Sequence, residues 1–536
     1  MRGNRYRIAD VRLELDGTEN DLKRKAARRL CVEPGRIRSL SLYKKSVDAR
    51  RKDDVHFVCT VDVESPKNSA PRDRKISEAK PYRYRLPPCG PLETRPVVVG
   101  FGPAGMFAAL ILAQAGQRPV VLERGSRVEE RKKQVRAFWE TGRLNPQCNV
   151  LFGEGGAGTF SDGKLNTGTR DPRIRKVLEE FAAAGAPKEI LYLAKPHIGT
   201  DRLPQTVRNI REKILSLGGE IRFDTQMTGL GIRDGKVNGI VFRGPGGHPE
   251  KMEARHVVLA VGHSARDTFS MLDSLGLPME AKPFAVGARI EHPQKLIDEA
   301  QYGKFAGHPA LGAADYKLAV HLENGRGVYT FCMCPGGTVA AAASEEGRLV
   351  TNGMSVFARD GRNANSALLV NVGPADFGAE GPLAGVEFQR RLEEKAFVLG
   401  GGGYRAPAQR VEDFLARRPS TGFGSVAPTY PLGVTPCSLD GCLPECVADS
   451  MREGIVRMGA RLRGFASPDA VLTAVESRSS SPVRLLRGDD MQSVRFQGFY
   501  PCGEGAGYAG GIVSAAVDGI KCAEKILESA PRPGAG

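Results

Sequence analysis

The sequence predicts an α/β protein with a parallel-sheet domain, an inserted α+β domain and a small α+β module at the N-terminal end. Three observations support this fold class. The chain has 536 residues, too many for a single hydrophobic core. A short apolar strand at 97–99 leads directly into a glycine-rich turn and a helix of small residues. Seven prolines within residues 65–96 separate this unit from the preceding residues, as expected for an extended linker.

Residues 1–90 are expected to form the N-terminal module and its proline-rich linker. Alternating apolar residues predict strands, and a helix-capping residue precedes a helical segment, which gives the order β-α-β-β. The expected elements are strands at 6–15, near 37–43 and near 55–63, and a helix capped by Thr18 that ends near Leu30.

The N-terminal region is strongly basic. Residues 1–95 hold 24 Lys and Arg against 14 Asp and Glu, whereas the rest of the chain holds 53 against 47. The predicted helix contributes Lys23, Arg24, Lys25, Arg28 and Arg29. Two interpretations stay open: a solubilising surface, or a surface that contacts RNA or an acidic partner protein.

A glycine-rich turn follows the first strand of the next unit. Gly100, Gly102 and Gly105 have G-x-G-x-x-G spacing, with Pro103 and Ala104 between the last two. We expect Gly100 to allow the tight turn, Gly102 to let the backbone approach a pyrophosphate, and Gly105 to let the helix pack on the strand. Backbone N–H groups and the helix dipole would then hold the pyrophosphate of a dinucleotide.

A second apolar strand ends at Glu123, 23 residues after Gly100. A carboxylate at this position accepts hydrogen bonds from ribose hydroxyls and repels a 2′-phosphate, which excludes NADP from the site. The strand, turn, helix, second strand and acid together predict a Rossmann-type domain at 95–280. FAD and NAD both use such a loop, so the loop alone leaves the cofactor open.

Further segments resemble the glutathione-reductase-type FAD superfamily. Residues 151–164 (LFGEGGAGTFSDGK) are similar to its loop beneath the flavin, and 257–263 (VVLAVGH) to the strand that closes over FAD. Residues 499–512 (FYPCGEGAGYAGGI) are similar to its C-terminal flavin motif, although Glu504 stands where the superfamily usually has Asp. The resemblance implies FAD, and beyond the first loop and Glu123 it implies these binding residues: Arg124, Gly155, Gly156, Ala157, Gly158, Thr159, Ser161, Asp162, Gly163, Gly262, Gly503, Glu504, Gly510, Gly511 and Ile512.

Longer phrases resemble a family of uncharacterised FAD-dependent dehydrogenases found in bacteria and plastids. They include FGEGGAGTFSDGKLNTGTRD, AVGHSARDTF, FAVGARIEHPQ and FCMCPGG, and together with DARRKDDVHF they extend over essentially the full chain. This resemblance implies the fold and the cofactor, and it supplies no substrate.

An interleaved domain order follows from these segments. The nucleotide domain at 95–280 is followed by an inserted substrate domain at 281–495, and 496–536 returns to the nucleotide site. We find no second strand and G-x-G-x-x-G unit in the sequence. The glycines at 400–403 lead into Pro407 and are expected in a mobile or substrate-side loop. If NAD(P)H donates electrons, it would therefore dock transiently in an open cleft.

Four residues are candidates for acid–base chemistry or substrate binding. His197, His263 and His292 titrate near neutrality and can exchange protons with a substrate. Arg289 can clamp a substrate carboxylate through two parallel hydrogen bonds. For each single histidine, a structural role in a cap or loop is the alternative. The expected substrate site combines residues 284–292, 331–337 and 351–355.

Cysteines offer a second type of chemistry. Cys332 and Cys334 are a candidate redox pair, with Cys334 as the catalytic thiol, because a thiolate beside a flavin passes electrons by thiol–disulfide exchange. Against this role, a bridge at C-x-C spacing closes a strained ring, and the Pro-Gly-Gly that follows also suits a structural role. Cys437, Cys442 and Cys446 lack regular zinc or iron–sulfur spacing, so no metal is expected.

The sequence thus predicts a cytoplasmic FAD-dependent oxidoreductase that acts on a small-molecule substrate. No apolar run is long enough to span a membrane, and the eleven cysteines show no disulfide framework. Two alternatives stay open. One is an FAD-dependent RNA-modifying protein that binds RNA through its basic module. The other is a flavin-binding protein whose module recruits a redox partner.

Overall fold

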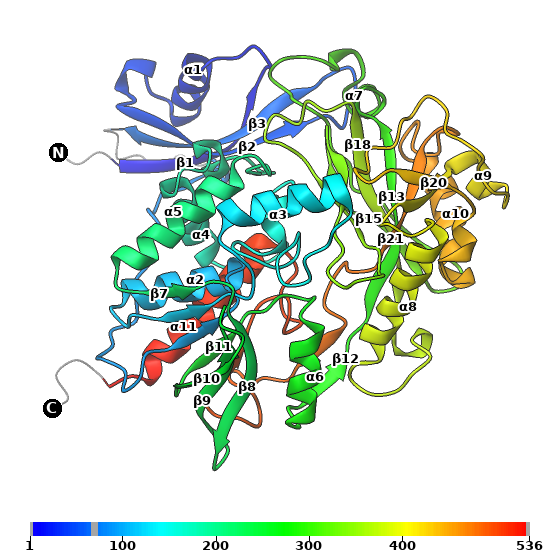
Figure 1. Ribbon diagram of the computed structural model, residues 1–536. Coiled ribbons are helices and arrows are strands. Elements are labelled where there is room, and N and C mark those ends of the chain that lie inside the picture. The colour runs from blue at the N-terminus through cyan, green and yellow to red at the C-terminus, as the bar shows by residue number, and fades with distance from the viewer. Residues whose placement is uncertain (1–3, 66–72, 532–536) are drawn as a thin grey trace.

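The computed structural model describes residues 4–65 and 73–531. Two prolines of the predicted linker, Pro66 and Pro71, lie outside the described residues. Figure 1 shows three parts: the dark blue N-terminal module, the parallel-sheet part with the red C-terminal helix, and the green to orange part around the largest sheet. No helix in the described part of the chain is both long enough and apolar enough to cross a membrane.

The N-terminal module is a four-stranded antiparallel sheet, in the order β2-β3-β1-β4, packed against one helix. Its elements are β1 (Asn4–Leu13), α1 (Glu19–Leu30), β2 (Ser39–Asp48), β3 (His56–Ser65) and β4 (Ile76–Glu78). The predicted N-cap is confirmed, because the Thr18 side chain accepts a hydrogen bond from the backbone N–H of Asp21.

The proline-rich segment is not a free linker, in contrast to the prediction. It contains β4, which pairs with β1 and closes one edge of the module's sheet. Further along, the Tyr84 hydroxyl donates a hydrogen bond of 2.9 Å to Glu524. The segment is therefore held both by backbone pairing and by side-chain contacts.

A five-stranded sheet forms the centre of the second part. Its order is β23-β11-β5-β6-β7, and every neighbouring pair is parallel. The strands are β5 (Val97–Val99), β6 (Val120–Leu122), β7 (Glu220–Arg222), β11 (Val257–Leu259) and β23 (Phe499–Pro501). One face carries α2 (Pro103–Gln114), α4 (Arg173–Ala183), α5 (Leu203–Ser216) and α11 (Ile512–Ser529). The other carries the antiparallel strands β8 (Gln226–Arg233), β9 (Lys236–Arg243) and β10 (Pro249–Glu253).

Side chains along these short strands alternate between the two faces of the sheet, which gives three layers: the helices, the parallel sheet and β8–β10. Val98 and Val121 pack among the helices, whereas Val97 and Val99 pack against β8–β10, because successive residues of a strand point to opposite faces. Helix α2 lies between the sheet and α11, so nearly every one of its residues is buried. β23 brings the C-terminal segment back to this sheet beside β11.

A seven-stranded sheet, in the order β14-β15-β18-β13-β21-β19-β20, forms the core of the third part. Its strands are β13 (Phe284–Pro293), β14 (Ala319–His321), β15 (Gly327–Cys334), β18 (Asn363–Val372), β19 (Ala406–Arg410), β20 (Val434–Pro436) and β21 (Val471–Glu476). Helices α7 (Gln294–Tyr302), α8 (Ala384–Leu399), α9 (Val411–Leu415) and α10 (Glu445–Gly459) contribute to its core.

Smaller elements lie between the two large sheets. The chain enters the third part through β12 (Met279–Ala281) and leaves it through β22 (Val483–Leu485), and these two strands pair with each other. β16 (Thr338–Ala341) and β17 (Thr351–Met354) form a hairpin. Helix α6 (Arg266–Ser274) follows β11, and α3 (Val128–Thr141) follows β6. Figure 1 shows α3 and α6 on the side of the parallel-sheet part (from here on the nucleotide part) that faces the seven-stranded sheet (from here on the inserted sheet).

Candidate functional site

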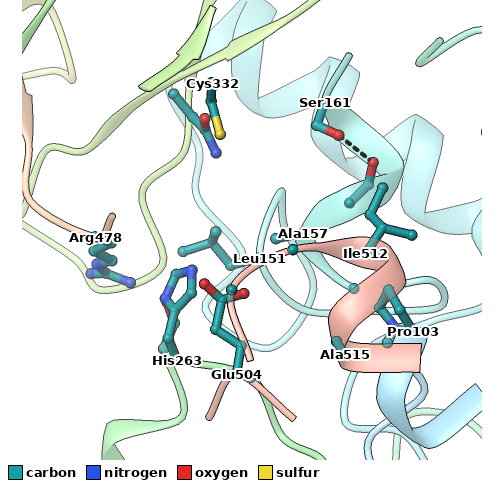
Figure 2. Close-up of a pocket in the computed structure, with 18 of the residues that line it drawn as sticks. Pro103, Leu151, Ala157, Ser161, His263, Cys332, Arg478, Glu504, Ile512 and Ala515 are labelled. Atoms are coloured by element: carbon teal, nitrogen blue, oxygen red, sulfur yellow. Dashed lines mark hydrogen bonds between the residues drawn. The ribbon is translucent and has the colours of Figure 1, made fainter. Parts of the chain in front are cut away.

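A cavity of about 440 Å³ extends from the glycine-rich turn of the parallel sheet to the inserted sheet. This volume is in the range of small-molecule sites. Figure 2 shows its central part, where Cys332 lies across the opening from His263 and Glu504. Ala157 and Ile512 form one side, and Arg478 lies on the opposite side. The two ends of the cavity thus belong to different parts of the fold.

The glycine-rich turn has the predicted geometry. Gly100 has a φ of +95°, and a Cβ at this position would lie 2.4 Å from the Ala260 carbonyl oxygen. A Cβ on Gly105 would lie 1.9 Å from the Gly100 carbonyl oxygen, which confirms the close packing of helix on strand. Gly102 differs, because a Cβ there would contact only the Gly156 Cα, at 3.7 Å. The first turn of α2 lines the cavity, and its amides lack intrahelical acceptors, so it can bind an anion.

Glu123 lies at the same end of the cavity and is 5% exposed. Its carboxylate accepts backbone N–H hydrogen bonds from Phe101 (2.7 Å), Gly125 (2.9 Å) and Gly153 (3.0 Å). Glu123 therefore ties the first loop to the second. Because a carboxylate has about four acceptor positions, one is left for the predicted ribose hydroxyl.

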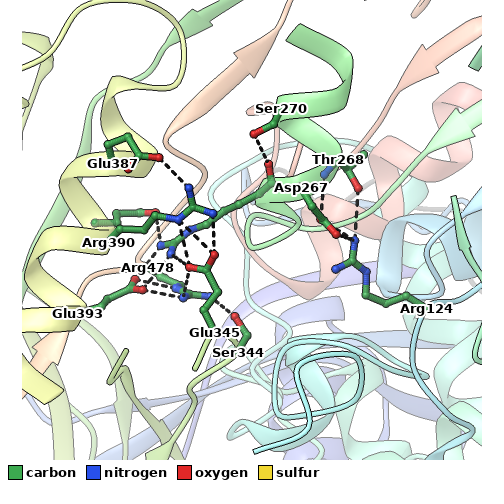
Figure 3. Close-up of polar contacts among 12 residues, drawn as sticks. Arg124, Asp267, Thr268, Ser270, Ser344, Glu345, Glu387, Arg390, Glu393 and Arg478 are labelled. Carbon is green, nitrogen blue, oxygen red and sulfur yellow. Dashed lines mark hydrogen bonds and ion pairs between the residues drawn. The ribbon is translucent and has the colours of Figure 1, made fainter. Parts of the chain in front are cut away.

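Arg124 occupies the outer side of this end. Its guanidinium lies 4.4 Å from the centre of the Phe152 ring and pairs with Asp267 of α6 at 2.7 Å. Figure 3 shows this pair together with Thr268. Arg124, Phe152 and Met227 all line the cavity and give it a wall suited to a flat ring.

A buried arginine, which no sequence pattern singles out, shapes the second loop. Arg131 of α3 is 0% exposed, and burial lowers its pKa to about 10, so it stays charged at neutral pH. It donates hydrogen bonds of 2.6–3.1 Å to the carbonyls of Asn149, Val150, Gly153, Glu154 and Gly156. The guanidinium supplies a donor to the Asn149 and Val150 carbonyls and a further donor to those of Gly153, Glu154 and Gly156, and so it fixes the loop along the cavity.

Most residues predicted to bind FAD line this cavity. They are Gly100, Gly102, Pro103, Ala104, Glu123, Arg124, Gly156, Ala157, Gly158, Ser161, Asp162, Gly163, Gly262, Glu504, Gly510, Gly511 and Ile512. Gly105, Gly155, Thr159 and Gly503 are not among the lining residues, and their assignment to FAD binding stays a prediction. They shape the loops: the Gly503 N–H, for example, donates a hydrogen bond of 2.7 Å to Asp518.

Glu504 is the acidic side chain of the C-terminal loop. It lines the cavity, and burial raises its pKa to about 7, with Lys282 opposing the shift only in part. A carboxyl group with this pKa exchanges protons near neutral pH. Glu504 thus places a titratable group in the cavity.

His263 also lines the cavity, as expected of a candidate acid–base residue. Burial, together with Arg478 and Arg266, lowers its pKa to about 3, so the imidazole is neutral at physiological pH. Its Nδ1 lies 2.9 Å from the Ser264 hydroxyl oxygen. Within the described part of the chain Nε2 has no hydrogen-bond partner, which leaves this nitrogen for a bound molecule.

Arg478 enters the cavity from a buried ion network (Figure 3). Glu393 of α8 accepts hydrogen bonds from Arg478 at 2.8 Å and from Arg266 of α6 at 2.7 Å. The whole network contains Arg266, Arg390, Arg478, Glu345, Glu387 and Glu393, and is formally neutral. It fixes Arg478 and connects the nucleotide part to the inserted part.

The prediction that Arg289 clamps a substrate is wrong. Arg289 is 0% exposed, does not line the cavity, and donates hydrogen bonds to Glu476 at 2.6 and 2.9 Å. It also donates to Asn352 and Asn365, at 3.1 Å in each case. Arg289 therefore lies behind the cavity wall and supports Glu476 and Asn352, which do line the cavity.

The structure also removes two of the three histidine candidates. His292 is 0% exposed, its Nε2 lies 2.7 Å from the Phe465 carbonyl oxygen, and burial lowers its pKa to about 4. His197 stacks on Phe357 and lies 3.0 Å from its carbonyl oxygen. Neither lines the cavity. On a strand, residues three positions apart point to opposite faces, so Arg289 and His292 of β13 do not share a site.

Cys332 and Cys334 both line the cavity, in different environments. A β-bulge between Phe331 and Cys334, with a φ of +42° at Cys332, breaks the alternation of β15. Cys332 is consequently exposed, whereas Cys334 is buried and its thiol contacts the Cys332 carbonyl oxygen at 3.1 Å. Burial raises the pKa of the Cys334 thiol. The geometry thus favours Cys332 over the predicted Cys334 as the accessible thiol.

Two of the three segments predicted for the substrate site reach the cavity. Residues 330–334 and 351–353 line it, whereas 284–292 do not. The glycines at 400–403 form a turn between α8 and β19 that is also outside the cavity, which corrects the expectation of a substrate-side loop. Lining residues that sequence reasoning missed include Lys164, Lys195, Asp315, Lys317, Arg359, Glu476 and Arg478.

The cations of the N-terminal module are partly engaged within the module. Arg24 pairs with Asp21, and Arg29 pairs with Asp73 at 2.7 Å. The module contacts the nucleotide part through its edge strand β2: the Lys45 N–H donates a hydrogen bond of 2.7 Å to the Tyr192 carbonyl. A contact with RNA or an acidic protein stays a prediction.

Comparison with known proteins assigns the chain to a family. Residues 283–479 match the family described as FAD-dependent protein, C-terminal domain-like, and residues 5–64 match a domain of unknown function, DUF8436. A Clostridium beijerinckii protein with the printed name "Uncharacterized protein" is 49% identical over 534 residues, covering 98% of this chain and 99% of the relative. This chain belongs to the same family. Because the match spans nearly the whole chain, the family includes all three parts of the fold.

Solved structures resemble this family member only weakly. An E. coli quinol fumarate reductase FrdA variant is 12% identical, covers 82% of this chain and 70% of its own, and has a TM-score of 0.37. A flavoprotein/dehydrogenase from Cytophaga hutchinsonii is 12% identical, covers 82% of this chain and 80% of its own, and has a TM-score of 0.35. Similarities of this size assign neither an activity nor a substrate.

The FAD-dependent family match supports FAD as the cofactor, and the cavity fits this group. Apart from Gly102 itself and its two chain neighbours, no heavy atom of the described residues lies closer than 3.7 Å to a Cβ built on Gly102, the position where a pyrophosphate would approach. The N-terminal ends of α2 and α11 both line the cavity, and helix N-termini favour negative charge.

Proposed function

We propose that the protein is an FAD-dependent oxidoreductase that acts on a small molecule bound between the two large sheets. One observation carries this proposal: a single cavity joins the dinucleotide loop at Gly100–Ala104 to side chains of the inserted sheet such as Cys332 and Asn352. A protein that only stored a flavin would not need a cavity continued into a second sheet.

The chain's own residues would hold FAD along the nucleotide end. The first turn of α2 would bind the pyrophosphate, and Glu123 the adenosine ribose. Ser161–Gly163 and the start of α11 would contact the ribityl chain and the flavin. When bound, FAD supplies a ring that accepts or donates two electrons, chemistry that side chains lack.

Two side chains near the middle of the cavity can hold or accept a proton. The Glu504 carboxyl group, with a pKa of about 7, can release or take up a proton at an oxygen atom near neutral pH. The neutral His263 can accept a hydrogen bond or a proton at Nε2. Arg478 is fixed by Glu393 and orients bound groups without moving a proton.

The electron donor is proposed to be the organic substrate itself or NAD(P)H that docks from solution. Among the sheets of the described residues, one is a five-stranded parallel sheet of the kind that binds a dinucleotide, and the sequence contains one dinucleotide loop. NAD(P)H would then share the cleft with the substrate, as separate half-reactions of one flavin allow. The comparisons give no support to the RNA-modifying alternative.

Anaerobic titration of the purified yellow protein tests this proposal. NADH, NADPH and a metabolite panel would be added in turn while the flavin absorbance is recorded. We expect at least one compound to bleach the bound flavin much faster than it bleaches free FAD. If FAD binds but no donor reduces it faster than free FAD, the flavin-binding partner protein is the better description.

A further inference from the structure

The cationic groups at the inserted-sheet end of the cavity are not fully neutralised. Elsewhere in the wall, Arg478 belongs to a neutral network and Glu476 is offset by Arg289. Lys164 and Arg359, in contrast, share the single carboxylate of Asp162. This cluster therefore carries one excess positive charge at a place enclosed by protein.

The Lys164–Asp162–Arg359 cluster is rigidly built. Asp162 is buried and accepts hydrogen bonds from Arg359 Nε at 2.9 Å and Nη2 at 2.5 Å, and from Lys164 Nζ at 2.8 Å. Although burial would raise the pKa of Asp162, Lys164 and Arg359 hold it at about 2. Lys164 Nζ also donates to the Met333 carbonyl. The backbone of Arg359 has a φ of +52° and packs tightly against Gly336.

Arg359 keeps one donor group free for a ligand. Its Nε and Nη2 are used by Asp162, but among the described residues Nη1 has no acceptor, and Arg359 lines the cavity. An arginine N–H without a partner in an enclosed site favours an anionic acceptor. The cavity-exposed Cys332 lies next to Met333, the residue that Lys164 contacts.

A second, outer pair of lysines continues the positive charge. Lys195 pairs with Asp315 at 2.6 Å, and both line the cavity. Lys317 lines the cavity as well, is exposed, and has no ion pair within the described part of the chain. This outer group again carries one excess positive charge. An excess of positive charge on one side of a cavity attracts anionic ligands and raises their local concentration.

We infer that the substrate is a carboxylate, held at its acid group by Lys164 and Arg359 with the rest of the molecule directed toward the flavin end. The single excess charge of the Lys164–Asp162–Arg359 cluster matches one carboxylate group, and the second excess charge lies on the outer group of Lys195, Asp315 and Lys317. This inference rests on the proposed function, since it names the substrate class of the same cavity.

The binding of simple carboxylates to the FAD-loaded protein tests the inference without turnover. Acetate, succinate and benzoate would be titrated while the absorbance spectrum of the bound flavin is recorded, with acetamide, succinamide and benzamide as neutral counterparts. We expect at least one acid to shift the spectrum in a saturable way, at least 10-fold more tightly than its amide. Equal effects of acids and amides, no effect of any acid, or tighter binding of inorganic phosphate would overturn the inference.

Substitutions of Lys164 and Arg359 test whether these residues form the carboxylate site. Arg359→Gln and Lys164→Met should each weaken the carboxylate at least 10-fold, and Arg359→Lys should weaken it less. Lys295→Met, at an 88% exposed side chain of α7, is the matched control and should leave binding within twofold. Loss of FAD from both Lys164→Met and Arg359→Gln would instead assign the cluster to the cofactor and overturn the inference. A wild-type protein that cannot bind FAD would contradict the proposed function itself, which is a separate outcome.

Discussion

The two ends of the cavity are built in different ways. The nucleotide end uses backbone amides and closely packed glycines from short contiguous segments, such as Gly100–Gly105. The inserted-sheet end uses side chains that tertiary structure brings together from distant positions, including Lys164, Cys332, Arg359 and Glu476. A backbone site leaves its pattern in the sequence because local conformation determines it, whereas a side-chain site depends on the register of strands far apart in the chain.

The largest expected effect on FAD binding tests the backbone end. Gly102→Leu places a side chain in the space where the pyrophosphate would approach, with little cost to the protein, because a Cβ contacts only Gly156. We expect FAD binding to weaken roughly 100-fold or more, about 3 kcal/mol. FAD retained after gel filtration measures this effect. Gly35→Leu is the control, since no atom lies within 4 Å of a Cβ there; a Gly102→Leu protein that keeps its FAD would refute the loop assignment.

Removing the guanidinium of Arg131 should have the next largest effect. Arg131→Met leaves five backbone carbonyls without their donor in a buried loop. We expect a loss of stability of roughly 3–5 kcal/mol and weaker FAD binding. Denaturant unfolding measures the stability. Arg136→Met on the same helix, at an 80% exposed side chain, should cost less than about 1 kcal/mol; equal costs would show that Arg131 does not organise the loop.

The titration of Glu504 gives a pH-dependent prediction of moderate size. Its pKa in the folded protein is about 7, above the ordinary value of 4.5. The protonated form therefore stabilises the FAD-free protein at low pH, and this contribution is lost as pH rises through 7. We expect roughly 1–3 kcal/mol less stability at about pH 8 than at about pH 5. Glu504→Gln should flatten this dependence, whereas Glu140→Gln, on an exposed helix face, should not. An unchanged slope in Glu504→Gln would contradict the assignment.

The smallest expected effect separates the two histidines. His292→Gln removes a buried hydrogen bond to the Phe465 carbonyl, so stability should fall by roughly 1–2 kcal/mol. The rate of flavin reduction should stay within twofold of the wild-type rate at each pH, because His292 does not line the cavity. His263→Gln should lower the rate of flavin reduction with little loss of stability, because His263 lines the cavity. A slower flavin reduction in His292→Gln together with an unchanged rate in His263→Gln would indicate His292, and not His263, as the acid–base residue.

Much of the fold could be predicted, because its determinants are local. The strand before Gly100, the helix after it and the N-cap Thr18 depend on neighbouring residues only. β4 could not be predicted, since the proline-rich composition around it resembles a linker and its pairing partner β1 lies far back in the chain. The order of the seven-stranded sheet was equally hidden, because β13 pairs with β18 and β21 from much later positions.

The candidate site likewise contains one end that local sequence patterns predict and one end that depends on tertiary contacts. Glycine and serine loops indicate the nucleotide end. Arg289 and His292 are candidates for substrate binding and acid–base chemistry from the sequence because both lie in one short stretch of β13. Alternation along that strand directs them to opposite faces, and the burial of both followed from partners such as Glu476 that no local pattern reveals. Arg131 and Arg359 resembled ordinary surface cations in the sequence.

The most direct test of the central claim is the cofactor content of the wild-type protein. The protein would be purified without added flavin, then supplemented with FAD, and the bound nucleotide would be released by heat and identified by mass spectrometry. We expect one FAD per chain, with no FMN or NAD, and the loss of this FAD in Gly102→Leu. A colourless protein that cannot be loaded with FAD would contradict it.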